Sequence, residues 1–469
     1  MTNPRGSAAA IAPEPFDGSG PVAIADDVTT LAELSAWDRQ LTSAGGCSHP
    51  IRLHGRVDAV DLATGETAPV YDTAAEPGGV LHVACGNRRE SACPACSAVY
   101  KRDARQLVRA GLAGGKGVPD SVAEHPCVFA TFTAPSFGPV HARRERGGKV
   151  LPCRPRRDAN KRVCPHGRDI SCPVRHSPDD PRLGRPMCPH CYGYERAVLF
   201  NAGAGKLWRR FLTYLPRHLA RLAGVRVKDA RELVRARFVK VSEYQARGVV
   251  HFHAVIRLDA NTKDPAIFRP PGPLWTADLL KRAVELAAEQ ASALVPVGKT
   301  GRAVRLRFGP QTDVRIIRSG TAAVLTREAV GNYIAKYVTK SIGVRGVPDT
   351  RIRHRSEVAS LRCPAHHKRL IETALALGLG KWAHQFGNGG HPLTKSRRYS
   401  VTFGQLRRAR AEHRKAQRWP DGELDPWGRP LDERVVLVLA HWSYAGTGYS
   451  ARTPGAELAL ASADMARGD

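Results

Sequence analysis

The segment VVHFHAVIRLD, residues 249–259, constrains the fold more strongly than any other part of the chain. β-Branched and apolar residues dominate it, which predicts a strand. Because successive side chains of a strand point to opposite faces, His251, His253 and Val255 share one face. The two imidazoles are roughly 7 Å apart at their Cα atoms, so they are either ligands of one metal ion or ordinary polar positions on a solvated face. The other face is wholly apolar and carries Val250, Phe252, Ala254, Ile256 and Leu258.

The charge of the chain indicates a polyanionic partner. Its 469 residues include 72 Lys+Arg against 43 Asp+Glu, a formal net charge of +29. DNA or RNA is the commonest partner for such an excess, and the alternative is the Arg-rich usage of a high-GC genome. The length suits about two to four domains, and 42% hydrophobic residues are enough for a packed core.

The cysteines predict structural zinc. We expect a cytoplasmic protein, because no apolar run reaches the ~18 residues of a membrane span and the first twenty residues lack the hydrophobic core of a signal peptide. Eleven cysteines in a reducing compartment are metal ligands more readily than disulfides. Their C-P-x-C spacing favours Zn²⁺.

A first cysteine group predicts one tetrahedral zinc site. CPAC at residues 93–96 is a tight knuckle, and a basic helix ending at glycine follows it. His49 and His82 are possible substitutes for a cysteine ligand. The four thiolates of the predicted site are Cys47, Cys85, Cys93 and Cys96.

A second group lies in an insertion at about 141–191 that is rich in Arg, Pro and Cys. This segment is too polar to fold around a core of its own, so a second structural zinc site is the expected way to order it. The alternative is a disordered basic loop. Spacing leaves the ligand set open among Cys153, Cys164, His166, Cys172, Cys188 and Cys191, with His176 and His190 nearby.

The segment VGNYIAKYVTK, residues 330–340, lies on a predicted helix spanning 326–343. Tyr333 and Tyr337 are four residues apart and share a helix face, flanked by Lys336 and Lys340. Paired tyrosines are commonly core aromatics, but neighbouring lysines argue against deep burial. A tyrosine hydroxyl beside ammonium groups is a plausible nucleophile for phosphorus.

A tyrosine that attacks a phosphodiester needs the phosphate charge neutralised, which a divalent cation on two imidazoles and a carboxylate provides. Glu243 lies an even number of residues before His251, and Gly248 permits a bend between them. We therefore predict Glu243, His251 and His253 as the metal ligands, with Gln245 as the alternative to Glu243.

Three ordered motifs carry a resemblance to the HUH endonuclease superfamily, in which U is a hydrophobic residue. They are FATFTAP (129–135), EYQARGVVHFHAVIRLD (243–259) and YIAKYVTKS (333–341). More narrowly, the chain resembles the replication initiators of actinobacterial rolling-circle plasmids and integrative elements. The family's tyrosine motif, U-x-x-Y-U-x-K, fits twice in overlap, pairing Tyr333 with Lys336 and Tyr337 with Lys340. The resemblance covers roughly residues 45–410.

The resemblance implies an α+β fold with a central antiparallel sheet that carries the double-histidine strand and flanking helices. It also implies a Mg²⁺- or Mn²⁺-dependent nick at a DNA origin, which leaves a 5′-phosphotyrosine and a free 3′-OH for rolling-circle replication with a host helicase and polymerase. A two-tyrosine HUH transposase or a relaxase would share this chemistry. A zinc-stabilised DNA-binding regulator without catalysis is the third hypothesis.

The remaining expectations concern domain boundaries and DNA contacts. Lys395, Arg397 and Arg398 are predicted to contact DNA, since basic side chains bind the phosphate backbone. The predicted regions are a disordered leader (1–40), a cysteine-rich zinc region (41–115), the nuclease domain with its insertion (120–345), a basic DNA-contacting region (346–415) and a C-terminal tail (416–469).

Overall fold

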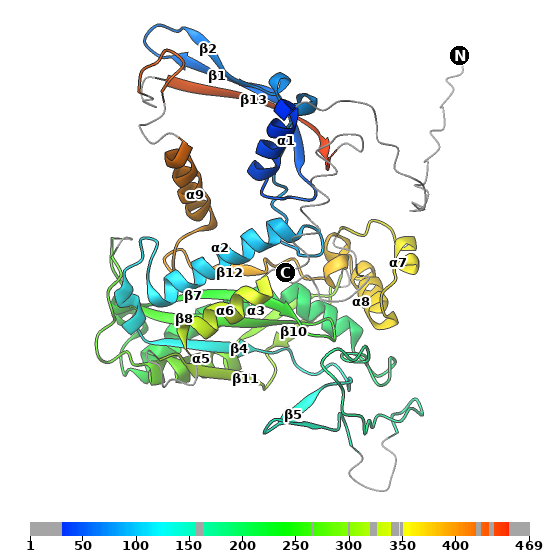
Figure 1. Cartoon of the computed structure of the whole chain (residues 1–469). Coiled ribbons are helices and arrows are strands. Elements are labelled where there is room, and N and C mark those ends of the chain that lie inside the picture. The colour runs from blue at the N-terminus through cyan, green and yellow to red at the C-terminus, as the bar shows by residue number, and fades with distance from the viewer. Residues whose placement is uncertain are drawn as a thin grey trace.

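The computed structural model describes residues 31–155, 163–264, 267–298, 301–318, 326–338, 347, 350–418, 424–430 and 436–449. Its centre is a five-stranded sheet in the order β11-β4-β8-β7-β12, in which every neighbouring pair is antiparallel (Figure 1). The α+β class and the antiparallel sheet are thereby confirmed. The strands are β4 (Cys127–Phe132), β7 (Val234–Tyr244), β8 (Val250–Ala260), β11 (Thr312–Ile316) and β12 (Leu393–Lys395).

Strand β8 contains the double-histidine segment, as predicted, and lies in the middle of the sheet. Its wholly apolar face packs into the largest hydrophobic cluster, together with α3 (Tyr194–Leu222) and α5 (Ala277–Gln290). Val255, on the histidine face, belongs to a second cluster with α2 (Pro94–Ala113) and α6 (Arg327–Val338). The alternation of β8 therefore places one helical layer on each face of the sheet.

The segment TADLLKRAVELAAEQASALV, residues 276–295, has a helical pattern throughout, but the helix it forms is shorter. It is α5, which ends at Gln290, and SALVP then forms β9 (Ser292–Pro296), paired with β10 (Ala303–Arg307). Tertiary packing decides this end: Val295 and Leu306 pack on α3 beside Gly203, where a Cβ would lie 2.3 Å from a Leu306 methyl carbon. The remaining helices are α4 (Val227–Leu233), α7 (Ser356–Ser360), α8 (Ala365–Ala376) and α9 (Phe403–Arg418), with 3₁₀ turns at Asp120–Glu124 and Gly380–Gln385.

A second sheet forms what is here called the N-terminal module. It includes residues that were predicted to belong to the disordered leader and the C-terminal tail. Helix α1 (Leu31–Ser43) begins inside the expected disordered leader, and its Trp37 is buried. Strand β13 (Val436–Thr447), from the expected tail, pairs with the whole of β1 (Ile51–Asp61). These strands lie apart from the five-stranded sheet (Figure 1). The module also contains β2 (Thr67–Asp72), β3 (Leu81–Val83) and 3₁₀ turns at Thr73–Ala75 and Pro77–Gly79.

The insertion at about 141–191 has little regular structure. It contains a short hairpin of β5 (Arg144–Arg146) and β6 (Lys149–Leu151). Among the residues that the structure describes between 143 and 188, the buried ones are four cysteines, His176 and Gly184. In the described part of the chain, no helix is at once long and apolar enough to cross a membrane.

Candidate active site

Glu243, His251 and His253 converge because β7 and β8 form one hairpin. Glu243 lies directly opposite His251 in the register, and His253 is two residues further along the same face. One carboxylate oxygen, Glu243 Oε2, is 3.0 Å from His251 Nε2 and 3.2 Å from His253 Nε2. The alternative ligand, Gln245, is turned away and accepts a hydrogen bond from Arg247 Nε at 2.8 Å. One ligand atom from each of the three residues lies within 4.8 Å of the others, close enough to hold one ion.

The electrostatics of this triad favour an ionised Glu243 and a neutral His253. Burial opposes ionisation of Glu243, but hydrogen bonds from His251 and His253 outweigh it and lower the pKa of Glu243 to about 2. Burial lowers the pKa of His253, against the opposing effect of Glu243. Anionic carboxylate with neutral imidazole is the protonation state that binds a divalent cation.

His253 is held in place by strand β4. Thr131 lies opposite His253 in the register, and its Oγ1 is 3.1 Å from His253 Nδ1. An Nδ1–H that donates to this hydroxyl would leave the Nε2 lone pair for a cation, in place of the hydrogen bond that His253 Nε2 makes to Glu243. The ring of Phe129 stacks on the imidazole, with centroids 5.7 Å apart and an interplanar angle of 6°. Strand β4, which carries most of the FATFTAP motif, thus supplies two contacts that orient His253.

Tyr333 reaches the triad from helix α6. Its hydroxyl is 3.4 Å from His253 Nε2, and its ring meets the imidazole edge-on at 5.1 Å between centroids. Tyr333 remains 38% exposed. The side chains of Lys336 and Tyr337, and the whole of Lys340, lie outside the described residues.

The position of α6 follows from its sequence. Val330 and Ile334 are buried against α2 and the sheet, on either side of Tyr333. At the N-terminal end of the helix, Arg327 donates to the backbone carbonyl of Leu112 at 2.7 Å and to that of Ala123. These anchors leave Tyr333 at the edge of the packed face, above His253.

The turn that joins β7 to β8 is pinned by a residue that the sequence analysis missed. Asn201 of α3 is fully buried, donates to the carbonyls of Gly248 and Phe386, and accepts from the Val250 backbone N–H at 2.9 Å. Gly248 has φ of 73°, and a Cβ there would lie 2.4 Å from a Leu370 methyl carbon. The sequence signal for this contact was an asparagine among the apolar positions of a long helix, because a buried amide needs hydrogen-bond partners.

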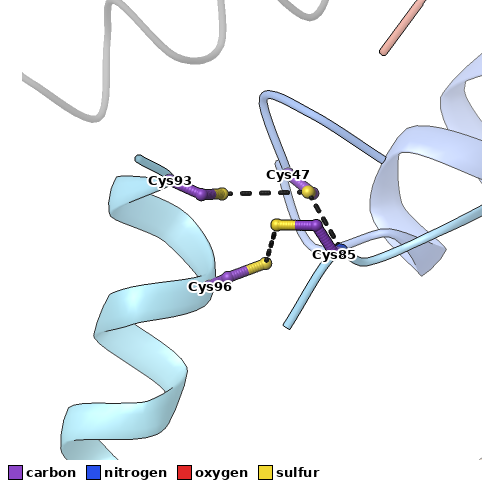
Figure 2. Close-up of side chains that lie close together, drawn as sticks. All are labelled: Cys47, Cys85, Cys93 and Cys96. Carbon is purple, nitrogen blue, oxygen red and sulfur yellow. Dashed lines mark hydrogen bonds between the residues drawn. The ribbon is translucent and has the colours of Figure 1, made fainter. Parts of the chain in front are cut away.

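The first cysteine group comes together as one cluster. Sulfur–sulfur distances are 3.7 Å for Cys93 with Cys47 and 3.7 Å for Cys85 with Cys96. Two thiolates on one tetrahedral zinc, each with a Zn–S bond of ~2.3 Å, would be ~3.8 Å apart. Figure 2 shows the four sulfurs turned toward one another beside the first turn of α2.

The environment of this cluster favours one thiolate, at Cys47, whereas burial raises the pKa of Cys85 to about 11. A hydrogen bond from Cys96 and backbone N–H groups of Cys85 and His49 lower the pKa of Cys47 to about 5, although burial opposes ionisation. The suggested substitutes are not in the group. His82 Nδ1 is 2.7 Å from Gln40 Oε1, and His49 is 3.0 Å from the Ser48 hydroxyl.

The insertion brings together two groups where one site was expected. One contains His141, Cys153, Cys172 and His176, and the other contains Cys164, His166, Cys188 and Cys191. Neither His141 nor His176 was among the predicted ligands. The spacing Cys172-x₃-His176 was a usable signal, but His141 has no nearby cysteine in sequence. His176 is also oriented, since its Nδ1 is 2.7 Å from Asp180 Oδ2.

The three predicted DNA-contacting residues lie in different environments. Lys395 donates to the backbone carbonyl of Ser400 at 2.7 Å, and Arg398 donates to that of Thr262 at 2.7 Å. Burial lowers the pKa of Lys395 to about 8. Arg397 is exposed. DNA contact by these residues stays a prediction, for which Arg397 is the best-placed side chain.

The chain is similar to known replication initiators. The family model described as RepSA, replication initiator protein, pSAM2, matches residues 33–464. A replication initiator protein from Streptomyces ambofaciens is 41% identical over 457 residues, covering 93% of this chain and 93% of that protein. No solved structure matches this chain.

Proposed function

The chain belongs to the replication initiator family of pSAM2, and on this premise we propose that it nicks one DNA strand at an origin by tyrosine transesterification, in the manner of HUH endonucleases. One observation carries the proposal. The Tyr333 hydroxyl lies 3.4 Å from His253 Nε2, beside the point where Glu243, His251 and His253 converge. A replication initiator acts on DNA, and this site combines a nucleophile with ligands for a cation.

The donor set fits a divalent cation. Two imidazole nitrogens and one carboxylate oxygen lie within 4.8 Å of one another, and Thr131 orients one imidazole. Glu243 Oε2, His251 Nε2 and His253 Nε2 would hold the ion, and the resemblance to HUH endonucleases implies Mg²⁺ or Mn²⁺. When bound, such an ion neutralises the non-bridging phosphate oxygens and aligns the scissile bond.

Tyr333 is the proposed first nucleophile. As the bond from its hydroxyl oxygen to phosphorus forms, the bond from phosphorus to the 3′ oxygen breaks, and the phenol proton is transferred overall to this oxygen, which leaves as the 3′-OH. The 5′ end of the strand stays attached as a phosphotyrosine. One phosphoester bond is exchanged for another without hydrolysis, so the step needs no energy from a nucleoside triphosphate.

The rest of the replication cycle follows from this step. The free 3′-OH primes rolling-circle synthesis by a host polymerase, with a host helicase to separate the strands. Tyr337, one helical turn further along the chain, would cleave after one round and transfer the strand to close the circle. Lys336 and Lys340 would hold phosphate or lower the cost of forming phenolate.

Zn²⁺ is the proposed ion for the cysteine groups. The Cys47 cluster has four sulfurs at distances that suit tetrahedral zinc. The two groups of the insertion have mixed cysteine and histidine donors, which also suit zinc. We assign these sites a structural role, since each contains four protein ligands and none for an attacking water.

The test is cleavage of single-stranded origin oligonucleotides with Mg²⁺ or Mn²⁺. Wild type is compared with Tyr333→Phe, Tyr337→Phe, the double variant and His251→Ala. A protein–DNA adduct that is lost in the double variant and in His251→Ala is expected. Tight origin binding without an adduct, with either metal, would instead favour a non-catalytic regulator.

A further inference from the structure

The outer edge of the N-terminal module is formed by an uncharged apolar strand. In β13, residues 437–444 are all exposed, including Leu437 (46%), Val438 (54%), Leu439 (40%), Trp442 (41%) and Tyr444 (69%). Side chains on both faces of this strand are therefore uncovered. No Lys, Arg, Asp, Glu or Pro occurs between Val436 and Thr447.

This edge has no partner among the described residues. The sheet order is β13-β1-β2, and β3 pairs with β1, so β13 has a strand on one side only. Natural proteins protect such edges with charged residues, proline, bulges or very short strands. The register shift between β13 and β1 falls after Tyr444, so residues 437–444 form a regular strand without a bulge. A long, apolar, unprotected edge is typical of a surface that pairs with another strand.

The charge distribution argues against nucleic acid as the partner. Over residues 35–93, 424–430 and 436–449 the sequence contains six arginines, no lysine and eight acidic residues, although the whole chain carries +29. A DNA-binding sheet would need a basic surface. The excess positive charge of the chain lies elsewhere, so two copies can approach through this module with the least repulsion.

We propose that β13 is a homodimer interface in which it pairs antiparallel with β13 of a second copy. A two-fold axis through Ala440, perpendicular to the sheet, preserves the two faces. It places Val438 opposite Trp442 of the partner subunit, so two apolar cross-strand pairs form and no like charges meet. The described part of each chain has one such edge, so the assembly closes at two copies. This inference is independent of the nicking chemistry.

The test measures the molar mass of the full chain in solution over the micromolar range by light scattering. The double variant Val438→Lys/Leu439→Lys introduces one charge on each face of β13. The control, Leu62→Lys/Val70→Lys, adds the same charge at two residues of similar exposure elsewhere in the module. We expect wild type and control to reach twice the 50.9 kDa of one chain, and the β13 variant to stay at one chain.

A wild type that stays at one chain mass throughout, or a β13 variant that dimerises like wild type, would overturn the proposal. Hydrogen exchange of the wild type gives a second readout that does not depend on the variant folding. Protection of the β13 backbone should rise with protein concentration while that of β2, the opposite edge, does not change. Equal behaviour of both edges would also count against the interface.

Discussion

The candidate active site and the two groups of the insertion differ in what brings their ligands together. Glu243, His251 and His253 sit on neighbouring strands whose register is set by backbone hydrogen bonds and by apolar cores on both faces of the sheet. The insertion has no comparable core: its buried described side chains are mainly the ligands themselves. The sheet therefore organises its site before an ion binds, whereas in the insertion we expect the ion to organise the protein.

The largest expected effect is the response of the insertion to metal removal. A strong chelator should make residues 141–191 sensitive to protease while the five-stranded sheet stays protected, because metal binding supplies folding free energy only where no core exists. Cys172→Ser should have the same effect on the insertion. Cys363→Ser is the matched control, since Cys363 is buried but belongs to no metal-ligand group in the described chain. Limited proteolysis with mass mapping measures this, and equal loss of both regions would break the comparison.

The second prediction concerns Glu243→Gln. The sheet should keep its melting temperature, because the amide occupies the same volume and the register does not depend on the charge. Nicking should fall by about 10²–10³-fold, as for loss of one preorganised electrostatic group. Initial rates of oligonucleotide cleavage at saturating Mn²⁺ would measure the loss. A variant that unfolds would show that the ligands, and not the strands, hold this site together.

A smaller effect is expected from Thr131→Val, which removes the hydroxyl beside His253 Nδ1 without changing the side-chain shape. Loss of such an orienting contact typically costs about 10–100-fold in metal affinity or activity. Titration of cleavage with Mn²⁺ should show a raised metal requirement. Thr394→Val, opposite Lys240 on the other face of the sheet, serves as the control. Unchanged metal dependence in Thr131→Val would mean that the strand alone orients the imidazole.

The smallest effect concerns Lys240, on the opposite face of the same hairpin. Burial lowers its pKa to about 7, and its ammonium lies 3.9 Å from the Phe252 ring centroid and 3.1 Å from the Ser242 hydroxyl. The unfolded chain then binds more protons than the folded one between about pH 7 and 10, so stability should rise with pH across this window.

Lys240→Met should remove that rise and raise stability near pH 6 by roughly 1–3 kcal/mol. Urea unfolding at several pH values, with and without chelator, measures it. The sheet should give the same pH dependence in both conditions if its stability is independent of metal. A flat wild-type profile would contradict the lowered pKa.

Local pattern predicted which side chains of the β7–β8 hairpin lie together. The alternation of residues 249–259 fixed which side chains share a face, and the even offset of Glu243 with a glycine between the strands predicted the hairpin partner. These features depend on strand geometry over a few residues, which the sequence shows directly.

Long-range contacts were not predictable in the same way. His141 meets Cys172 and His176 only through loop closure, and the α3 residue Asn201 meets the β7–β8 turn only through packing. Strand β13 pairs with β1 across almost the whole chain, although its apolar residues gave no indication of a partner. Such contacts depend on the tertiary fold, on which local spacing carries no information.

The most direct test of the central claim is to locate the DNA on the protein after the first cleavage. Trypsin cuts after Lys336, so Tyr333 and Tyr337 fall in separate peptides, EAVGNYIAK and YVTK. Mass spectrometry of the trapped wild-type adduct should find the phosphodeoxynucleotide on EAVGNYIAK, because the Tyr333 hydroxyl lies 3.4 Å from His253 Nε2. An adduct found only on YVTK, or on neither peptide, would contradict the account.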